Sequence, residues 1–498
     1  MPAFQHRLEE ARRHLLAQDF SGALSRYDKL SRAFPGQAVV WFEYGNTASR
    51  LGQREIAGRA WEKAISLDPR NVDLILQLGH QYQGARQPEQ ARACFARAAA
   101  ADAKAINPRI SLALLFEHQH RLAEARAIVE ECLAIDAHDE QARYLWALLD
   151  RREGQLEAAE RRLRDLIQSE PKHPYVRYAC RYELAHILDR TERFDEAMQA
   201  LAEAKQLVRA LADTELLLKT YDQAAEIARR CVSSLPTNVL RRWAKDFPPE
   251  KRLAVQPLAL LAGHPRSGTT LLEQVLGAHP GVAALDEPPA FAQTVEPAFR
   301  QNTEHSTARL NVLRRAYTRA LLDEAGAAAG TGRLLLDKNP SLTVQLPVAL
   351  RVFPELRVVV ALRDPRDVVL SCYFQNILLN TTNANFLSFE RLAKHYADLM
   401  DIWLTVREWE GLAWLETRYE DMVADLEKEG RRVTGFLDLG WHEEQKRFYE
   451  KGRQLYSPTY QDVRQPVYAR SVGRWRAYEK HLAPMLPVLE PYCRTFDY

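Results

Sequence analysis

A 34-residue period runs through the first part of the chain and constrains its fold more than any other feature. An alanine recurs at this spacing, and a bulky apolar residue follows each one four positions later. The alanines are Ala23, Ala57, Ala91, Ala125 and Ala159, and the bulky residues are Tyr27, Trp61, Phe95, Val129 and Leu163. A fixed period of this length indicates stacked two-helix units, because one such unit cannot bury its apolar face alone. We therefore expect an all-α array in this part of the chain.

This pattern resembles the tetratricopeptide repeat, a helix–turn–helix unit in which the small residue lets two helices pack closely. Five repeats are recognisable over residues 4–171, and a sixth, with Ala197 and Ala204, follows a four-residue insertion. The resemblance implies a solenoid with a concave face that binds a protein or peptide. A dimerisation or spacer role stays open, and so does a homo-oligomer.

The end of the repeats and the following breakers predict the domain boundaries. The stretch from Lys205 to Ala228 stays helical without repeat signatures, and we expect it to cap the solenoid. Turn-forming residues follow at Ser233–Thr237 and Phe247–Pro249. The sequence therefore predicts a solenoid with capping helices over residues 1–235, a linker at 236–254 and a second domain over 255–498.

The second domain opens with a strand, a glycine-rich turn and a helix. Leu258–Ala262 is an apolar run typical of a buried strand, Gly263–Gly268 is the turn, and a helix is expected from Thr269. The two glycines have the spacing of a phosphate-binding loop, in which backbone N–H groups and the helix dipole converge on an anion. We expect the loop to hold a phosphate-like group, and the alternative is an ordinary Gly-Ser turn.

One position separates this loop from that of nucleotide triphosphatases. Thr269 stands where those enzymes carry lysine, and the basic residue, Arg266, lies earlier inside the loop. The loop is therefore not expected to hold a Mg-bound triphosphate. A P-loop kinase or nucleotide triphosphatase stays the alternative, since Leu334–Asp337 has the apolar-then-Asp form of a Mg-binding strand.

Further apolar runs alternate with helical patterns and predict an α/β domain with a central parallel sheet. Strands are expected at 333–337, 356–362 and 412–415, with an amphipathic helix over 389–406. Ligands of such sheets bind at the carboxyl ends of the strands. Each candidate residue of the site follows a predicted strand end.

Composition excludes several classes of function and compartment. The formal net charge of +2 gives no field that favours nucleic acid. The six cysteines are scattered without a C-x-x-C pair, which argues against a zinc site and disulfides and fits a reducing compartment. The charged N-terminal stretch does not look like a signal peptide, and no apolar run is long enough to span a membrane. We expect a cytoplasmic protein without membrane contact.

Two segments carry a second family resemblance. Residues 263–271 resemble the 5′-phosphosulfate loop of sulfotransferases, which use 3′-phosphoadenosine 5′-phosphosulfate (PAPS). Residues 360–371 resemble their 3′-phosphate element, in which an arginine at a strand end, here Arg363, and a serine eight residues later, here Ser371, hold the 3′-phosphate. The resemblance implies a P-loop-like sulfotransferase domain that needs PAPS and no metal.

The subgroup that this domain most resembles is the protein-tyrosine sulfotransferases. Residues 278–287 resemble the segment of their catalytic glutamate, which implies that Glu287 is the general base, and residues 337–340 resemble the segment of their catalytic lysine, Lys338. Tyr419 would lie against the adenine, and Arg474 stands where they carry a lysine that binds the cofactor. Thr459 aligns with a hydroxyl that polarises the sulfate. Gln375 departs from the pattern, because those enzymes often place a second arginine there.

The chemistry of sulfuryl transfer gives each candidate a role. Loop residues would hold the 5′-phosphosulfate through their backbone N–H groups and hydroxyls; they are Ser267, Gly268, Thr269, Thr270 and Leu271. Arg266 would place its planar guanidinium against the phosphosulfate, and Lys338 would reach the transferring group. A base must take the proton of the acceptor hydroxyl, and the rivals of Glu287 are His264, His279 and Asp286.

The acceptor stays open at this point. A tyrosine of a protein or peptide is implied by the subgroup resemblance and by the attached solenoid, whereas a carbohydrate hydroxyl is the alternative, because a fold does not choose its acceptor. A non-catalytic repeat scaffold is a further alternative.

Overall fold

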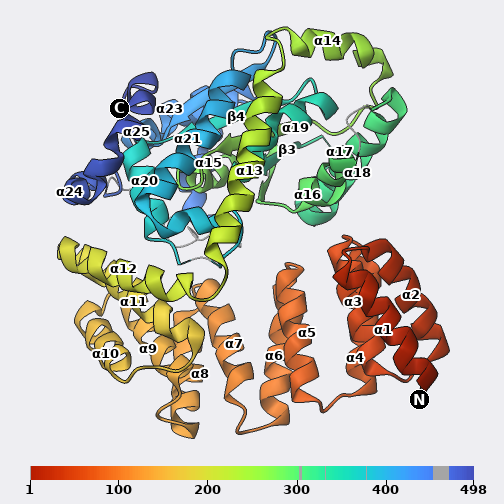
Figure 1. Cartoon of the computed structure of the whole chain (residues 1–498), viewed down its shortest axis with the longest axis vertical. Coiled ribbons are helices and arrows are strands. Elements are labelled where there is room, and N and C mark those ends of the chain that lie inside the picture. Colours follow the sequence, from red (N-terminus) through yellow and green to blue (C-terminus); the bar gives the residue numbers. More distant parts are fainter. Residues whose placement is uncertain (1, 302–304, 331, 377, 452–469) are drawn as a thin grey trace. The chain divides into compact units, whose positions relative to one another are not determined.

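The computed structural model describes residues 2–301, 305–330, 332–376, 378–451 and 470–498 (Figure 1). The chain divides into two compact units, Met1–Glu183 and Leu184–Tyr498. The boundaries that the sequence predicts stay a prediction. Part of the predicted linker is helical, since α14 (Val239–Asp246) and the 3-10 helix η1 (Pro249–Lys251) lie within it.

The first unit is an array of antiparallel helix pairs, as the 34-residue period predicts. Its helices are α1 (Pro2–Leu16), α2 (Phe20–Ala33), α3 (Ala38–Arg50), α4 (Arg54–Leu67), α5 (Val72–Gly84), α6 (Pro88–Ala101), α7 (Ile106–His118), α8 (Leu122–Ile135), α9 (Glu140–Arg152), α10 (Leu156–Gln168) and the first part of α11 (Pro174–Arg190). The expectation of an all-α repeat array is confirmed.

The packing of the repeats explains the period. The five alanines of the period are buried. In two of the repeats the ring four residues later, Trp61 or Phe95, fills the space beside a glycine of the preceding helix. A Cβ atom on Gly45 would lie 2.4 Å from the Trp61 ring, and one on Gly79 would lie 2.4 Å from the Phe95 ring. Glycine is therefore required at these two helical positions for space.

The second unit contains a five-stranded sheet in which every neighbouring pair is parallel. Its strand order is β2-β3-β1-β4-β5, formed by β1 (Leu258–Gly263), β2 (Val282–Asp286), β3 (Leu334–Lys338), β4 (Arg357–Leu362) and β5 (Ala413–Arg418). The central parallel sheet is confirmed. Two details differ from the expectation: β2 was missed, because Ala283 and Ala284 make a weak strand signal, and β5 extends through its polar end to Arg418.

Helices and short 3-10 segments complete this unit. They are α12 (Phe194–Arg209), α13 (Thr214–Ser233), α15 (Thr269–Gly277), α16 (Ala290–Thr294), α17 (Glu296–Gln301), α18 (Thr307–Ala325), η2 (Gly326–Ala329), η3 (Pro340–Gln345), α19 (Leu346–Val352), α20 (Pro365–Tyr373), η4 (Asn383–Leu387), α21 (Phe389–Val406), α22 (Tyr419–Ala424), α23 (Leu426–Phe436), η5 (Glu443–Lys451), η6 (Arg474–Tyr478), α24 (Glu479–Leu482), η7 (Ala483–Met485) and α25 (Leu486–Thr495).

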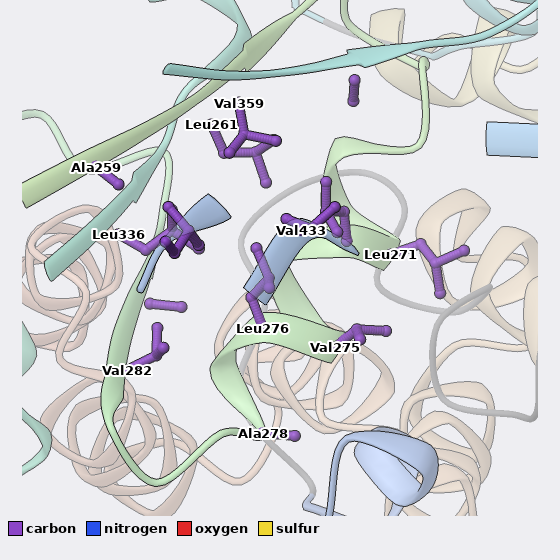
Figure 2. Packing of buried hydrophobic residues seen from close by; sticks show 14 of the residues in the cluster. Ala259, Leu261, Leu271, Val275, Leu276, Ala278, Val282, Leu336, Val359 and Val433 are labelled. Atoms are coloured by element: carbon purple, nitrogen blue, oxygen red, sulfur yellow. The ribbon is translucent and has the colours of Figure 1, made fainter. Parts of the chain in front are cut away.

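One face of the sheet packs against α15 and α23 (Figure 2). Alternate strand residues, such as Leu261, Leu336 and Val359, point into this core, where Val275 and Val433 of the two helices meet them. Residues of the opposite parity face α18, since Asp337 accepts a hydrogen bond from the Tyr317 hydroxyl of that helix. The sheet is thus covered on both faces, as buried parallel sheets are.

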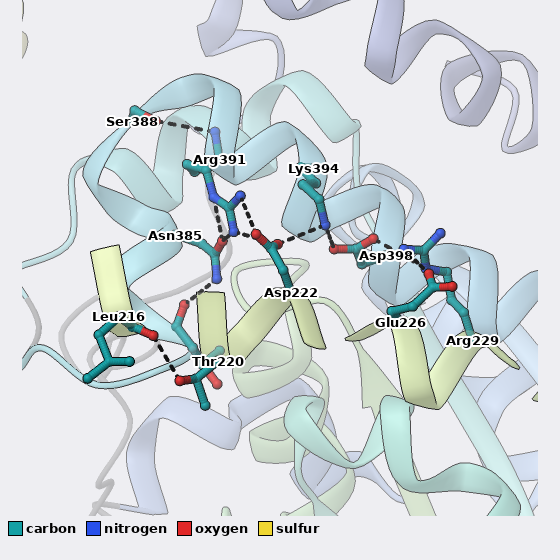
Figure 3. A network of polar contacts seen from close by, with 11 residues as sticks. Leu216, Thr220, Asp222, Glu226, Arg229, Asn385, Ser388, Arg391, Lys394 and Asp398 are labelled. Carbon is teal, nitrogen blue, oxygen red and sulfur yellow. Dashed lines mark hydrogen bonds and ion pairs between the residues drawn. The ribbon is translucent and has the colours of Figure 1, made fainter. Parts of the chain in front are cut away.

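Helix α13 packs against α21 of the α/β domain through ion pairs and hydrogen bonds (Figure 3). Its predicted role as a cap of the solenoid stays a prediction. In the described part of the chain, no helix combines the length and the apolar character that crossing a bilayer requires.

The close approach of Gly79 to Phe95 gives a stability prediction for the repeats. We expect Gly79→Ala to lower the free energy of unfolding, because overpacking costs about 1–3 kcal/mol and exceeds the helix-propensity gain of at most about 1 kcal/mol. Gly58→Ala is the matched control, since a Cβ at this helical glycine meets no atom within 4 Å, and it should be stabilising. Urea unfolding followed by circular dichroism measures both, and an equal effect of the two variants would contradict the packing argument.

Candidate functional site

The carboxyl ends of the five parallel strands bring most of the predicted site residues to one edge of the sheet. Lys338 is the last residue of β3. Glu287 directly follows β2, Arg363 follows β4, and Tyr419 follows β5. The register pairs Asp286 with Lys338 and Gly263 with Ala361 on neighbouring strands. The loop after β1 lies at this same edge.

The two glycines of the loop are both required by its backbone. Gly263 has φ 134°, and a Cβ there would lie 2.4 Å from the Ala361 carbonyl oxygen of β4. Gly268 has φ 87° and directly precedes α15, and a Cβ there would lie 2.6 Å from the Tyr419 ring. The loop therefore runs unusually close to β4 and to an aromatic ring, and the helix dipole of α15 points at it.

Arg266 joins the loop to the predicted 3′-phosphate element. Its Nε donates a hydrogen bond of 3.0 Å to the Ser371 hydroxyl, and its carbonyl accepts one of 3.2 Å from Arg363 Nη1. Arg266 has φ 73°, a left-handed conformation that costs a non-glycine residue about 1–2 kcal/mol. Two segments that are about a hundred residues apart in the sequence thus meet at side chains that the sequence predicted.

Arg363 also contacts the C-terminal segment and the residue that follows β5. Its Nη2 donates a 2.6 Å hydrogen bond to the Ser471 carbonyl, and its guanidinium lies 4.9 Å from the centre of the Tyr419 ring. The side chain is only 8% exposed, yet its Nε has no hydrogen-bond partner in the described part of the chain. An unsatisfied buried donor on a cation is costly, which indicates a place for an anionic ligand.

Lys338 forms an ion pair with two carboxylates at once. Its side chain is 0% exposed, its Nζ lies 2.9 Å from Glu287 Oε1, and it also pairs with Asp286. Burial alone would lower the pKa of Lys338, but the charges of Glu287 and Asp286 outweigh it and raise the pKa above its ordinary value. The lysine therefore stays charged and is buried beside the partly exposed Glu287. That it reaches the transferring group stays a prediction.

Glu287 is more accessible than the candidate bases Asp286 and His264. Its side chain is 42% exposed, while Asp286 is buried against Lys338. Glu287 has φ 50°, and its N–H donates a 2.8 Å hydrogen bond to the Lys338 carbonyl, so backbone and side chain both tie it to β3. Lys338 thus holds one carboxylate oxygen of Glu287, while the side chain stays partly exposed.

Both rival histidines hold structural hydrogen bonds. His264 is buried beside His395, and burial lowers its pKa to about 4. His279 donates from Nε2 to the Gly440 carbonyl over 2.8 Å and accepts at Nδ1 from the Gly281 N–H. Both ring nitrogens of each histidine are thus engaged in hydrogen bonds within the protein.

The remaining predicted residues lie in the loop and the first turn of α15, near the C-terminus, or outside the described residues. The side chains of Ser267, Thr269, Thr270 and Leu271 are buried in the loop and first turn of α15, and the Ser267 N–H donates to the His264 carbonyl within the turn. Arg474 pairs with Asp189 over 2.8 Å. Thr459 lies outside the described residues.

Asp367 is a residue that the sequence argument missed. Its carboxylate accepts 2.7 Å hydrogen bonds from the N–H groups of Gly473 and Trp475, so it fixes the C-terminal segment against α20. Asp367 lies four residues, about one helical turn, after Arg363, and this spacing could have indicated a role near the site. Within the described residues, no group of three or more His, Cys, Asp or Glu side chains has the arrangement of a metal site.

Asp337 does not face the phosphate loop. It has the parity opposite to Leu336, is fully buried, and accepts a hydrogen bond from Tyr317 on the far side of the sheet. Burial raises the pKa of Asp337 to about 7. The apolar-then-Asp pattern of β3 therefore does not bring a carboxylate to the loop as a Mg-binding strand would.

Comparison with known families agrees with this geometry. Residues 257–443 match the family model described as the sulfotransferase family, and residues 38–71 match the tetratricopeptide repeat. Residues 257–443 form a sulfotransferase-family domain. The domain thus follows a tetratricopeptide-repeat array in the same chain.

The curated proteins that this chain resembles are distant in sequence. An uncharacterized protein of Aquifex aeolicus (strain VF5) is 26% identical over 341 residues, which cover 66% of this chain and 43% of that protein. Protein-tyrosine sulfotransferase A of Caenorhabditis elegans is 27% identical over 197 residues, which cover 37% of this chain and 50% of that protein. The chain thus spans about half the length of these two relatives.

Among solved structures, the sulfotransferase domain from the Synechococcus PCC 7002 olefin synthase is 19% identical to this chain. That match covers 50% of this chain and 97% of the other, with a TM-score of 0.35.

The raised pKa of Asp337 gives a pH prediction. The native state binds the proton of the Asp337 carboxyl more tightly than the unfolded state does. Its contribution to the free energy of unfolding is therefore fully present below about pH 4 and is lost as the pH rises to about 7. Relative to Asp337→Asn, the wild type should lose stability across this window, at no more than about 1.4 kcal/mol per pH unit. Urea unfolding of both proteins from pH 4 to 8 measures the difference, and a constant difference would contradict the assignment.

Proposed function

We propose that the second domain transfers the sulfuryl group of PAPS to an acceptor hydroxyl. The observation that carries this proposal is the meeting of two anion-binding elements at Arg363, which donates to the Arg266 carbonyl of the loop and retains a buried Nε without a described partner. The match to the sulfotransferase family over residues 257–443 supports it.

The residues of the edge fit the parts of this donor. The positive end of the α15 dipole and the hydroxyls of Thr269 and Thr270 would receive the 5′-phosphosulfate. Arg363 and Ser371 would hold the 3′-phosphate, for which the buried Nε of Arg363 supplies an unused donor. The Tyr419 ring, in contact range of Gly268, would lie against the adenine.

Each charged residue would then have one task in the transfer. PAPS supplies a sulfuryl group, and as the acceptor oxygen forms its bond to sulfur, the bond from sulfur to the bisphosphate oxygen breaks. Arg266 would stabilise the negative charge that grows on the leaving bisphosphate. Glu287 would take the hydroxyl proton of the acceptor. Lys338 would remain charged after this proton transfer, because Asp286 stays beside it.

A tyrosine of a protein or peptide is the acceptor that we propose. The support is that relatives of this domain are named protein-tyrosine sulfotransferases and that a repeat array of a kind that often binds peptides lies in the same chain. A carbohydrate hydroxyl is the competing acceptor, and the two are separated by the transfer assay below. Cytoplasmic location is part of the proposal, since all six cysteines are free thiols, as in a reducing compartment.

The donor class is tested by binding. Adenosine 3′,5′-bisphosphate at a hundred times its dissociation constant should raise the free energy of unfolding by about 2.7 kcal/mol. Arg363→Ala should weaken this binding about 10- to 100-fold, because a hydrogen bond to a charged group is lost, and Ser371→Ala should weaken it by up to about 10-fold. Thermal unfolding and titration calorimetry measure these effects.

The matched control for this experiment is Arg319→Ala, which removes an arginine on the surface of α18 and should leave binding unchanged. Stabilisation by Mg-ATP alone would replace the proposal with a kinase or nucleotide triphosphatase. Binding of neither nucleotide would favour a non-catalytic scaffold.

The base is tested by transfer from PAPS to a tyrosine-containing peptide and, separately, to an oligosaccharide. Glu287→Gln should lower kcat about 10²- to 10⁴-fold on the true acceptor, because general-base catalysis is lost, while affinity for the bisphosphate stays the same. Glu250→Gln, an exposed carboxylate of η1, is the control. An unchanged kcat in Glu287→Gln would remove Glu287 from the mechanism, and transfer only to the oligosaccharide would exclude tyrosine.

A further inference from the structure

Two buried histidines meet at the phosphate loop, one from the loop itself and one from α21. His264 follows β1 and is 1% exposed, and His395, from the middle of α21, is 3% exposed. His264 Nε2 and His395 Nδ1 are 2.8 Å apart, although the two residues are separated by 131 positions in the sequence. The proposed function gives neither ring a task in binding or chemistry.

The direction of the hydrogen bond between them follows from their surroundings. His264 Nδ1 lies 2.7 Å from the Pro265 carbonyl oxygen, which can only accept, so Nδ1 carries a proton. Burial lowers the pKa of both rings, that of His395 further through His264, Lys394 and Arg391, so both are neutral. The remaining nitrogen of His264, Nε2, must then accept, and His395 Nδ1 donates to it.

This chain of hydrogen bonds ends on the peptide that sets the shape of the loop. The Pro265 carbonyl is contacted from a second side by the Cys372 thiol, at 3.7 Å. In a trans peptide the following N–H points the opposite way, so fixing this carbonyl also fixes the direction of the Arg266 N–H. Arg266 needs such support, because its left-handed backbone is unfavourable unless its neighbours impose it.

The helix that carries His395 is itself held by ion pairs on both sides of that residue (Figure 3). Asp222 of α13 lies 2.8 Å from Arg391 and 3.2 Å from Lys394, and Arg229 of α13 lies 3.6 Å from Asp398. The Tyr221 ring of α13 lies 5.5 Å from the His395 ring. His395 is thus fixed from α13 and directed at the loop.

We infer that His395 is a positioning residue for the phosphate loop, which it holds through His264 in the anion-binding shape before any ligand arrives. The inference about the loop's shape stands on the contacts above, and only its effect on PAPS binding rests on the proposed function.

The test compares His395→Ala with His395→Asn in the full-length protein. Asparagine places an amide donor near the position of Nδ1, so it restores the hydrogen bond to His264 that alanine removes. Hydrogen exchange of the ligand-free protein, followed by mass spectrometry of the peptide that contains residues 264–268, should be faster in His395→Ala and close to wild type in His395→Asn. This readout needs no ligand.

The second arm measures titration of adenosine 3′,5′-bisphosphate. His395→Ala should weaken binding about 10-fold, the size expected for one hydrogen bond, and the KM for PAPS should rise with little change in kcat. His395→Asn should bind within about 3-fold of wild type, since it retains the donor.

Tyr492→Phe is the matched control, because it removes a part-buried 2.6 Å hydrogen bond to Asp401 on the same helix, and the hydrogen bonds of its hydroxyl within the described residues do not reach the loop. It should leave the exchange of the loop unchanged. Loop exchange in His395→Ala that equals wild type, or that rises equally in Tyr492→Phe or His395→Asn, would overturn the inference. Failure of the wild type to bind the bisphosphate would instead contradict the proposed function and leave the exchange result to decide the inference.

Discussion

The arrangement of the site depends on one guanidinium. Arg363 donates to the carbonyl of Arg266 in the loop and to that of Ser471 in the C-terminal segment, and its plane lies over Tyr419 after β5. Three segments far apart in the sequence are therefore fixed relative to one cation. Such a cation is an effective centre for this purpose because arginine presents five donors in a rigid plane, so it can satisfy backbone carbonyls and still offer a donor to an anion.

At the ends of β2 and β3, a buried cation is balanced by two carboxylates. A lysine as fully buried as Lys338 would lose its charge without partners, and two adjacent carboxylates keep it ionised. This pairing has a conformational cost, since the backbone of Glu287 is left-handed where its side chain reaches Lys338. Because Asp286 and Lys338 are direct neighbours in the parallel register, one of the two carboxylates is supplied by the sheet itself and the other is left near the surface.

Much of this arrangement could be predicted from sequence, and the exceptions have two physical causes. Local patterns sufficed for the repeats, the loop glycines and the strand ends, because periodicity and positive φ are properties of short segments. The depth of Lys338 and the pairing of His264 with His395 could not be predicted, since both depend on which side chains tertiary packing brings together. Strand β2 was missed for a milder reason: its alanines have low strand propensity, and pairing with β3 overrides it.

In both units a glycine leaves room for an aromatic ring from another element. In the repeats, Gly79 leaves room for the Phe95 ring, and in the loop Gly268 leaves room for the Tyr419 ring. In the helix, glycine is needed for space alone, so a smaller ring could compensate for an added methyl group. At Gly268 the backbone also has φ 87°, so removing the ring would relieve the contact but not the strain. The same residue type is therefore replaceable in principle in the array and irreplaceable in the loop, where the backbone itself is the proposed binding surface.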